Sequence, residues 1–308
     1  MTPDPREILR EIGLDPTEVN DIQILSQRHG HAIWRIATWK SSYVLKWLPE
    51  PDGTTEIEAY RLLQKLGVPT LPLYGIADQA LLLEDLGRSE AWRLAIEADA
   101  ARPEVGRAVA QWYRVLHVGG EALLARGSVP ALLTRETDEL DPDAILATGQ
   151  AFGLADYRVW RLAAEHIEMI KAAIGKLSVT LNCNDFYWTN LALSKGDQAQ
   201  LEATIFDYHL MGIGMRYSDW RNVTGSLYGE ALLAFREAYG PTDPREEVPD
   251  RPTASLYGLI VAARMPAFPR WAESCLDRVI GGGLEQDLSE AIDLAQLLAT
   301  AHERTSQA

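Results

Sequence analysis

Three polar residues with side chains suited to metal and proton chemistry lie close together in the second half of the chain. Asp185 and Asn190 occur in LNCNDFYWTNLALSK, and Asp207 follows the apolar stretch ATIF. The short apolar segments 191–194 and 202–206 predict a β-hairpin, which would bring the three side chains to one end. Magnesium takes its ligands from one or two carboxylates, an amide oxygen and substrate phosphates. We therefore expect Asn190 and Asp207 to bind a nucleotide-associated Mg²⁺ ion, and Asp185 to accept the proton of an attacking hydroxyl group.

A lysine within an apolar segment is the second candidate. Lys46 lies in SYVLKWLP, whose composition predicts a strand made for burial. One interpretation is an edge-strand lysine that faces water. The other is a lysine that binds the α- and β-phosphates of a nucleotide and is held by a helix glutamate, for which Glu58 is the first candidate and Glu56 its competitor. The chain order of lysine, glutamate, Asp185 and Asp207 favours the second interpretation, because chance rarely produces it.

The elements that must position these residues change in character along the chain. In the first ninety residues, segments rich in Ile, Val, Trp and Tyr are separated by turn residues and predict a five-stranded antiparallel sheet. The expected strands span residues 21–26, 32–39, 42–48, 71–76 and 80–83. A short polar helix near residues 5–12 precedes them, and apolar residues at helical spacing predict a second helix, 55–67, after the third strand.

Beyond this region almost every pattern is helical. Apolar residues recur at helical spacing over segments 104–126, 157–176, 219–239, 252–265 and 284–302. The fold class is therefore α+β, and a length of 308 residues favours two lobes. We expect a nucleotide-binding lobe of residues 1–86 and a helical catalytic and substrate-binding lobe of residues 87–308, which contains the catalytic hairpin.

Composition excludes several classes of partner. Forty-four acidic and twenty-nine basic residues give a net charge of −15, which repels nucleic acid. The two cysteines, Cys183 and Cys275, provide neither a disulfide framework nor metal-ligand spacing. The N-terminus lacks the apolar stretch of a signal peptide, and no apolar run is long enough for a membrane span. We expect a cytoplasmic monomer or homodimer without nucleic-acid or membrane partners.

Several of these segments resemble the aminoglycoside phosphotransferase and choline kinase branch of the protein-kinase-like fold, over residues 22–223. Leu45 and Lys46 resemble the strand lysine of that family. EAYRLLQKLGVPTLPL, which begins at Glu58, resembles its glutamate helix and the exit that follows. LLLEDLG, which ends at Gly87, resembles the hinge whose backbone receives the adenine.

The later motifs match the same family. RVLH, which ends at His117, resembles the leucine-histidine pair at the end of a helix motif in that family. NDFYWTN, which ends at Asn190, resembles the catalytic loop H-G-D-x-x-x-x-N and places Asp185 at the position of the base. IFDYHL carries Asp207 at the position of the metal-binding aspartate, and YSDW places Asp219 at that of a structural aspartate.

The resemblance implies a bilobal kinase-like fold that binds ATP, or GTP in its place, together with Mg²⁺ in the cleft between the lobes. It implies adenine contacts from the backbone of Glu84 and Leu86. It also implies a phosphate-covering loop in SQRHGHAIWRI, where Gly30 allows a close backbone approach. The acceptor would be a hydroxyl of a small molecule, such as an aminoglycoside, a choline-like alcohol or a sugar. The segment after Asp207 is too short for the activation loop of a protein kinase.

Two residues of the loop depart from the family pattern. Cys183 stands where the loop has histidine, and Asn184 where it has glycine, so the hydrogen bonds of an imidazole must be lost or replaced. A second hypothesis is therefore a nucleotide-binding pseudokinase or regulatory protein with little transfer activity. ATP turnover that depends on Asp185 separates the two hypotheses.

Three further residues near the loop have alternative interpretations. His209 is expected to be a loop histidine with a backbone partner rather than a ligand, because Mg²⁺ prefers oxygen. Tyr187 and Trp188 are suited either to stacking on a substrate ring or to wedging the loop against the helices.

Overall fold

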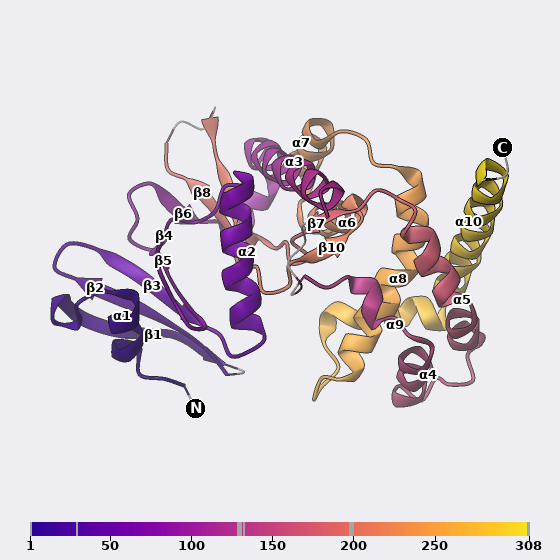
Figure 1. Cartoon of the computed structure of the whole chain (residues 1–308), viewed down its shortest axis with the longest axis horizontal. Coiled ribbons are helices and arrows are strands. Elements are labelled where there is room, and N and C mark those ends of the chain that lie inside the picture. Colours follow the sequence, from indigo (N-terminus) through magenta and orange to yellow (C-terminus); the bar gives the residue numbers. More distant parts are fainter. Residues whose placement is uncertain (1, 29, 128–130, 132, 197–199, 307–308) are drawn as a thin grey trace. The chain divides into compact units, whose positions relative to one another are not determined.

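The chain forms two compact units, each built from three segments (Figure 1). The computed structural model describes residues 2–28, 30–127, 131, 133–196 and 200–306. The first unit comprises Met1–Leu133, Leu181–Met211 and Asp219–Pro241. The second unit comprises Thr134–Thr180, Gly212–Ser218 and Thr242–Ala308. These units group the chain by contact and do not coincide with a boundary at residue 86, so the division into lobes stays a prediction.

The first unit begins with the five-stranded antiparallel sheet that the sequence predicts. Its strands are β1 (Val19–Arg28), β2 (His31–Thr38), β3 (Ser42–Trp47), β4 (Leu73–Ala77) and β5 (Ala80–Glu84). They lie in the order β1-β2-β3-β5-β4, which places β3 in the middle of the sheet.

The two faces of this sheet carry different side chains, because successive residues of a strand point to opposite sides. Leu45 of β3 and Leu82 of β5 are paired and buried, and they share one core with Leu9 of α1 (Pro5–Ile12). Their neighbours Lys46 and Leu81 are paired on the other face. That face is covered by α2 (Asp52–Leu66), which ends at Gly67 with a left-handed φ of 71°.

The remainder of the first unit holds the segment that carries Asp185, Asn190 and Asp207. Its elements are β6 (Trp92–Leu94), η2 (Glu97–Ala101), α3 (Pro103–Ala125), β7 (Thr180–Asn182), η4 (Trp188–Asn190), β8 (Leu191–Ser194), β9 (Ala203–Ile205), α6 (Arg216–Ser226) and α7 (Gly229–Tyr239), of which β7 and α6 begin in the second unit. Strands β8 and β9 form the expected hairpin, with Leu191 opposite Ile205. The backbone N–H of Phe206 also donates to the carbonyl of Asn190 (3.0 Å), so the hairpin fixes Asn190 close to Asp207.

The helix predicted over residues 219–239 is two helices, α6 and α7. The chain breaks at Tyr228, which is extended (φ −140°) and whose N–H donates to the carbonyl of Ala100 (3.0 Å). Gly229 follows with a left-handed φ of 56°. An extended residue followed by a left-handed one cannot continue a right-handed helix, and the apolar periodicity across the break does not reveal this.

The second unit is mainly helical. It contains η3 (Glu136–Glu139), α4 (Pro142–Ala151), α5 (Arg158–Ile174), β10 (Gly212–Gly214), α8 (Pro244–Ala263), η6 (Arg270–Ala272), α9 (Glu273–Ile280) and α10 (Gly283–Ser306). The predicted start of the fourth long helix at residue 252 is wrong: α8 begins at Pro244, because the Asp243 side chain caps it by accepting from the N–H of Arg245 (2.9 Å).

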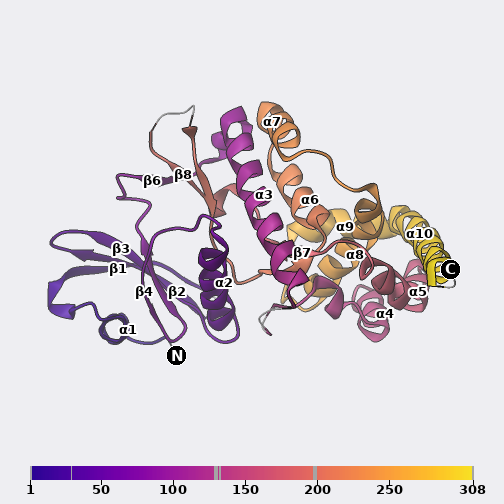
Figure 2. The ribbon, with the colours of Figure 1, turned by 45° about the horizontal axis from the view of Figure 1, so that its top comes forward.

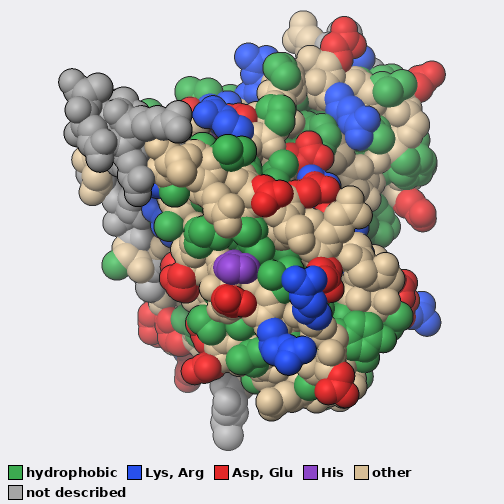
Figure 3. Space-filling model, turned by 90° about the vertical axis from the view of Figure 1, so that its right-hand side faces the viewer, with side chains coloured by type: hydrophobic (Ala, Val, Ile, Leu, Met, Phe, Trp, Pro, Cys, Tyr) green, Lys and Arg blue, Asp and Glu red, His purple; other side chains and the backbone are tan. Residues whose placement is uncertain are grey.

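The core of the second unit joins α5, α8 and α10, with Ile167, Leu256 and Leu288 fully buried. The side that carries α5 and α10 shows acidic, basic and hydrophobic side chains interspersed (Figure 3). Within the described residues, no helix has the length and apolar character needed to cross a bilayer.

Helices α3 and α7 lie side by side in the first unit (Figure 2). A Cβ atom added to Gly106 of α3 would lie 2.1 Å from the carbonyl oxygen of Ala231 in α7. We expect Gly106→Ala to lower the free energy of unfolding by about 1–3 kcal/mol, because a rigid backbone atom must move. Urea unfolding measures this change. Gly119→Ala on the same helix is the matched control, since its Cβ would meet only Leu66 at 3.5 Å, and equal destabilisation by both variants would contradict the prediction.

Candidate active site

Lys46 is the residue that connects the sheet to the segment that carries Asp207. Its Nζ lies 2.6 Å from Oε2 of Glu56 and 2.8 Å from Oδ1 of Asp207, and all three residues belong to the first unit. Because β3 is a central strand and Lys46 is only 9% exposed, the interpretation of a water-facing edge lysine is wrong. The structure thus brings together a phosphate-binding candidate and a metal-binding candidate that are 161 residues apart.

The helix glutamate that pairs with Lys46 is Glu56, and the preference for Glu58 is corrected. Glu56 lies one turn before Tyr60, and both are fully buried on the face of α2 that packs against the sheet. Glu58 is two residues further on, so at 100° per residue it points away from that face. It pairs instead with Arg61 (2.6 Å).

Neighbouring charges determine the protonation states of Lys46 and Asp207. Burial lowers the pKa of the Lys46 ammonium, but Glu56 and Asp207 outweigh it and raise the pKa. Burial raises the pKa of Asp207, yet the hydrogen bond from His209 and the charge of Lys46 outweigh burial and hold it well below its usual value. Asp207 is therefore an ionised carboxylate, and it also has a left-handed φ of 74°, a strained conformation for aspartate.

Within the described part of the chain, His209 pairs with a carboxylate rather than with the expected backbone group. Its Nδ1 lies 2.6 Å from Oδ1 of Asp207, so the partner is the carboxylate itself. Burial lowers the pKa of His209, but the hydrogen bond and the charge of Asp207 raise it overall. Its ring also lies edge-on to His31, the first residue of β2, with centroids 6.3 Å apart, so the start of β2 is close to the Asp207–His209 pair.

Asp185 and Asn190 form a second pair. Nδ2 of Asn190 donates to Oδ2 of Asp185 (2.7 Å) and to its carbonyl (3.2 Å). The side-chain nitrogen of Asn190 is thus engaged in hydrogen bonds to Asp185, and its side-chain oxygen is the atom that can bind a cation. Burial and the negative charge of Asp207 raise the pKa of Asp185, which favours its use as a proton acceptor.

The loop that carries Asp185, the candidate base, is held through its backbone. The buried Asp219 carboxylate accepts from the N–H groups of Cys183 and Asn184, each at 3.0 Å, and lies 3.1 Å from Nε2 of His117. Nδ1 of His117 lies 2.7 Å from the hydroxyl of Tyr239. These contacts brace the loop although Cys183 replaces the usual histidine, and burial raises the pKa of its thiol, which keeps it protonated.

Asn184 stands at the usual glycine position for a physical reason. Its φ is 63°, in the left-handed region, which asparagine tolerates better than most residues. Its Nδ2 donates to the carbonyl of Leu210 (3.2 Å), which ties the loop to the segment after Asp207.

Buried aromatic residues anchor both aspartates. Phe186, next to Asp185, lies edge-on to Tyr113 of α3 with ring centroids 6.0 Å apart. Tyr208, next to Asp207, lies 4.8 Å from the ring of Tyr60 in α2 and stacks with Trp112 of α3 at 6.5 Å. The rings fix the backbone on each side of the candidate site.

The hinge contains a residue that sequence reasoning missed. Asp85 lies between Glu84 and Leu86 and is buried, and it accepts from Arg35 (2.7 and 3.1 Å) and Ser42 (2.6 Å). The side chain of Glu84 has another partner. Its carboxylate accepts a hydrogen bond from the hydroxyl of Tyr74, and this bond raises the pKa of Tyr74 to about 12. Asp85 therefore fixes the backbone that the adenine assignment requires, while the contacts of Glu84 and Leu86 with a nucleotide stay predictions.

Gly30 lies in the β1–β2 turn with a left-handed φ of 85°. A Cβ there would meet Cγ of Pro49 at 3.5 Å, which is an ordinary contact. Conformation, rather than space in this structure, is thus what requires glycine at this position. Its contact with phosphate remains a prediction.

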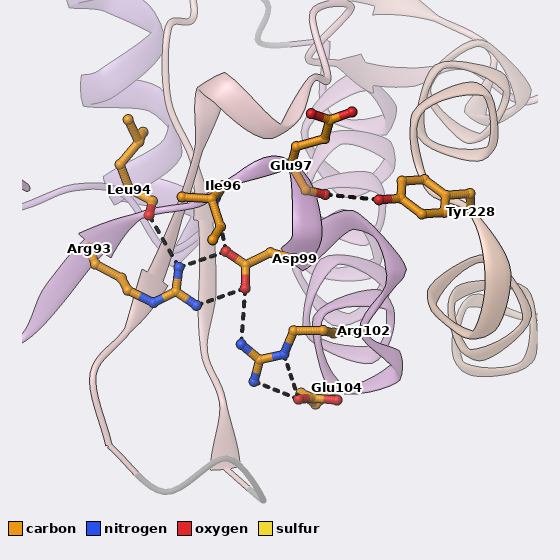
Figure 4. A network of polar contacts seen from close by, with 8 residues as sticks. All are labelled: Arg93, Leu94, Ile96, Glu97, Asp99, Arg102, Glu104 and Tyr228. Atoms are coloured by element: carbon orange, nitrogen blue, oxygen red, sulfur yellow. Dashed lines mark hydrogen bonds and ion pairs between the residues drawn. The ribbon is translucent and has the colours of Figure 1, made fainter.

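A network of polar contacts surrounds Asp99 of η2 (Figure 4). Both carboxylate oxygens of Asp99 accept from Arg93 (2.6 and 2.8 Å), and Arg102 donates to one of them (2.9 Å). The network holds η2, which packs against η4 of the loop that carries Asp185.

In this loop, Tyr187 is 49% exposed and lies beside Trp188. This exposure favours contact with a ligand, rather than wedging of the loop against the helices, for Tyr187.

Comparisons with known proteins agree at the level of the fold. No family model matches the sequence, and no curated protein is significantly similar to it. Solved structures do match. A choline/ethanolamine kinase family protein from Mesorhizobium loti superposes with a TM-score of 0.61 at 15% identity, over 95% of this chain and 99% of its own. The chain has a protein-kinase-like fold.

Two further structures extend this comparison. The choline kinase of Streptococcus pneumoniae gives a TM-score of 0.60 at 11% identity, over 92% of this chain and 97% of its own. Spectinomycin phosphotransferase, solved with ADP and spectinomycin, gives 0.51 at 11% identity, over 96% and 97%. The resemblance predicted from the sequence is therefore confirmed for the fold, and these neighbours are small-molecule kinases.

The assignment of Glu56 is tested by comparing two glutamates of one helix. We expect Glu56→Gln to lower the free energy of unfolding by about 3 kcal/mol, because it removes one charge of a buried pair. It should also weaken ADP binding, since Lys46 loses the partner that orients it. Glu58→Gln, on the exposed face, should change stability by less than about 0.5 kcal/mol. Calorimetric titration with ADP and urea unfolding measure both effects, and the opposite ranking would restore Glu58.

Proposed function

We propose that this protein transfers the γ-phosphoryl group of ATP to a hydroxyl group of a small molecule. GTP is an alternative donor. Asp185 is the general base, Lys46 binds the α- and β-phosphates, and Asn190 with Asp207 holds Mg²⁺. The observation that carries this proposal is the double contact of the buried Lys46 ammonium with Glu56 and Asp207.

The residues present fit a magnesium ion. Asp207 is ionised, and Asn190, which the hairpin holds close to Phe206, has an amide oxygen that its hydrogen bonds to Asp185 do not use, so the donor set is of the oxygen type that Mg²⁺ prefers. When bound, the ion supplies positive charge that offsets the charge of the phosphates during transfer.

The chain's own residues account for the remaining steps. Lys46 holds the donor phosphates, and Asn190 orients Asp185 through the 2.7 Å hydrogen bond. Asp185 takes the proton of the acceptor hydroxyl as its oxygen attacks phosphorus, and its raised pKa strengthens it as a base. Asp219 keeps the loop in place by holding two of its N–H groups.

We propose a hydroxylated small molecule of the aminoglycoside, choline or sugar type as the acceptor. Support comes from the similar structures, which are described as choline and ethanolamine kinases and a spectinomycin phosphotransferase. The net charge of −15 is compatible with a cationic acceptor. A screen of hydroxylated amines, sugars and antibiotics with ATP, read by ADP release, identifies it.

Asp185→Asn tests the reaction with an acceptor from that screen. We expect turnover to fall by at least about 100-fold, because the amide cannot accept the proton, while ADP affinity stays unchanged. Steady-state kinetics and calorimetry measure the two quantities. Transfer at the parental rate would exclude Asp185 as the base. Binding of Mg·ATP without transfer to any acceptor would instead support the nucleotide-binding pseudokinase.

Asp207 is tested by removing the metal or its ligand. We expect Asp207→Ala to abolish the increase in ADP affinity that Mg²⁺ produces, as EDTA does in the parent protein. Asp207→Asn, which keeps the volume, should behave in the same way. Calorimetric titration of ADP with and without Mg²⁺ measures the effect. A variant with the full magnesium-dependent increase would rule out the metal role.

A further inference from the structure

The candidate metal site contains a nitrogen atom that a magnesium site does not need. Among the described residues, Glu56, Asp207 and His209 form a group whose potential ligand atoms all lie within 4.8 Å of one another. The Lys46 ammonium contacts both carboxylates, Glu56 at 2.6 Å and Asp207 at 2.8 Å. Glu56 is fully buried, whereas the side chains of Asp207 and His209 are 29% and 21% exposed and can be reached by an ion. The pair left for a cation is Asp207 with His209.

The geometry of this pair is close to that of two adjacent ligands. Nδ1 of His209 lies 2.6 Å from Oδ1 of Asp207. Two ligands at right angles on an ion, each at about 2.1 Å, are about 3.0 Å apart, so a shift of a few tenths of an ångström suffices. The side chain of His209 is 21% exposed, which leaves room for that shift.

The backbone directs both side chains to the same place. Tyr208 lies between Asp207 and His209 in the chain. It is fully buried against Tyr60 and Trp112, which fixes the backbone of both neighbours. Asp207 adopts its strained left-handed conformation at this point. A hydrogen bond between Asp207 and His209 does not by itself require a strained backbone. If both side chains bind one metal ion, the strain has a function, because it aims them at the same point.

We propose that His209 is an imidazole ligand of the metal ion held by Asp207, and that the site therefore prefers a divalent transition-metal ion to Mg²⁺. Imidazole binds first-row transition metals well, whereas Mg²⁺ prefers oxygen. This inference deepens the proposed function, since it concerns the metal of the same site, but metal binding is measurable without transfer. The competing explanation is that His209 only donates a hydrogen bond to Asp207.

Mn²⁺ is the probe, because its unpaired electrons report directly bound nitrogen. The full-length protein with Mn²⁺, with and without ADP, is examined by electron spin echo envelope modulation. We expect ¹⁴N modulation from a bound imidazole in the parent protein and its loss in His209→Ala. His31→Ala is the matched control, because among the described residues His31 is the imidazole whose ring lies beside that of His209, and its loss should leave the modulation unchanged.

Affinity provides the second measurement. We expect the preference for Mn²⁺ over Mg²⁺, measured as a ratio of dissociation constants, to fall roughly tenfold in His209→Ala. His209→Glu, which replaces nitrogen with oxygen, should lower the same ratio while retaining Mg²⁺ binding. Thermal unfolding confirms that each variant folds.

The outcomes separate this inference from the proposed function. Mn²⁺ bound without ¹⁴N modulation in the parent, or an unchanged preference in both His209 variants, overturns the imidazole ligand even if phosphate transfer is found. Modulation that depends on His209 supports it even if no acceptor is ever phosphorylated. Modulation that disappears in His31→Ala but persists in His209→Ala assigns the nitrogen to His31 and overturns the proposal.

Discussion

The active end of the first unit depends on one buried positive charge. Lys46 stands in the central strand of the sheet, where an unpaired ammonium would cost several kcal/mol. Glu56 and Asp207 compensate this charge from two different parts of the chain. The strand, the helix and the segment after β9 are therefore linked through one side chain, which holds the phosphate-binding and metal-binding candidates next to each other.

Much of the fold and the core of the site are predictable from sequence, because the signals are local. Alternating apolar residues and turn residues give the five strands, and apolar spacing gives α3, α5 and α10. Asp185, Asn190 and Asp207 are predictable because a hairpin places its two ends together whatever its surroundings. The order of Lys46 before these residues adds the resemblance to kinases, which the fold confirms.

The predictions that fail depend on contacts outside the local sequence. Glu56 and Glu58 differ only in the helix face they occupy, and that face is set by packing against the sheet. Asp85 becomes important through its contacts with Arg35 and Ser42, which lie fifty and forty-three residues earlier. The break at Tyr228 follows from a hydrogen bond to Ala100 on a distant segment. Each is a long-range interaction that replaces a reasonable local expectation.

The interleaving of the two units has a consequence for synthesis of the protein on the ribosome. Strands β1 to β5 are contiguous in the sequence and can pair as soon as they emerge. The partner of Lys46 in the loop segment, however, follows 161 residues later, and the last segment of the first unit ends only at Pro241. During this interval the sheet presents an incompletely compensated charge on one face, which weakens its burial against α2. The end of the sheet that carries Lys46 is therefore among the last parts to become stable, and a chain truncated before residue 207 lacks the carboxylate that pairs with Lys46.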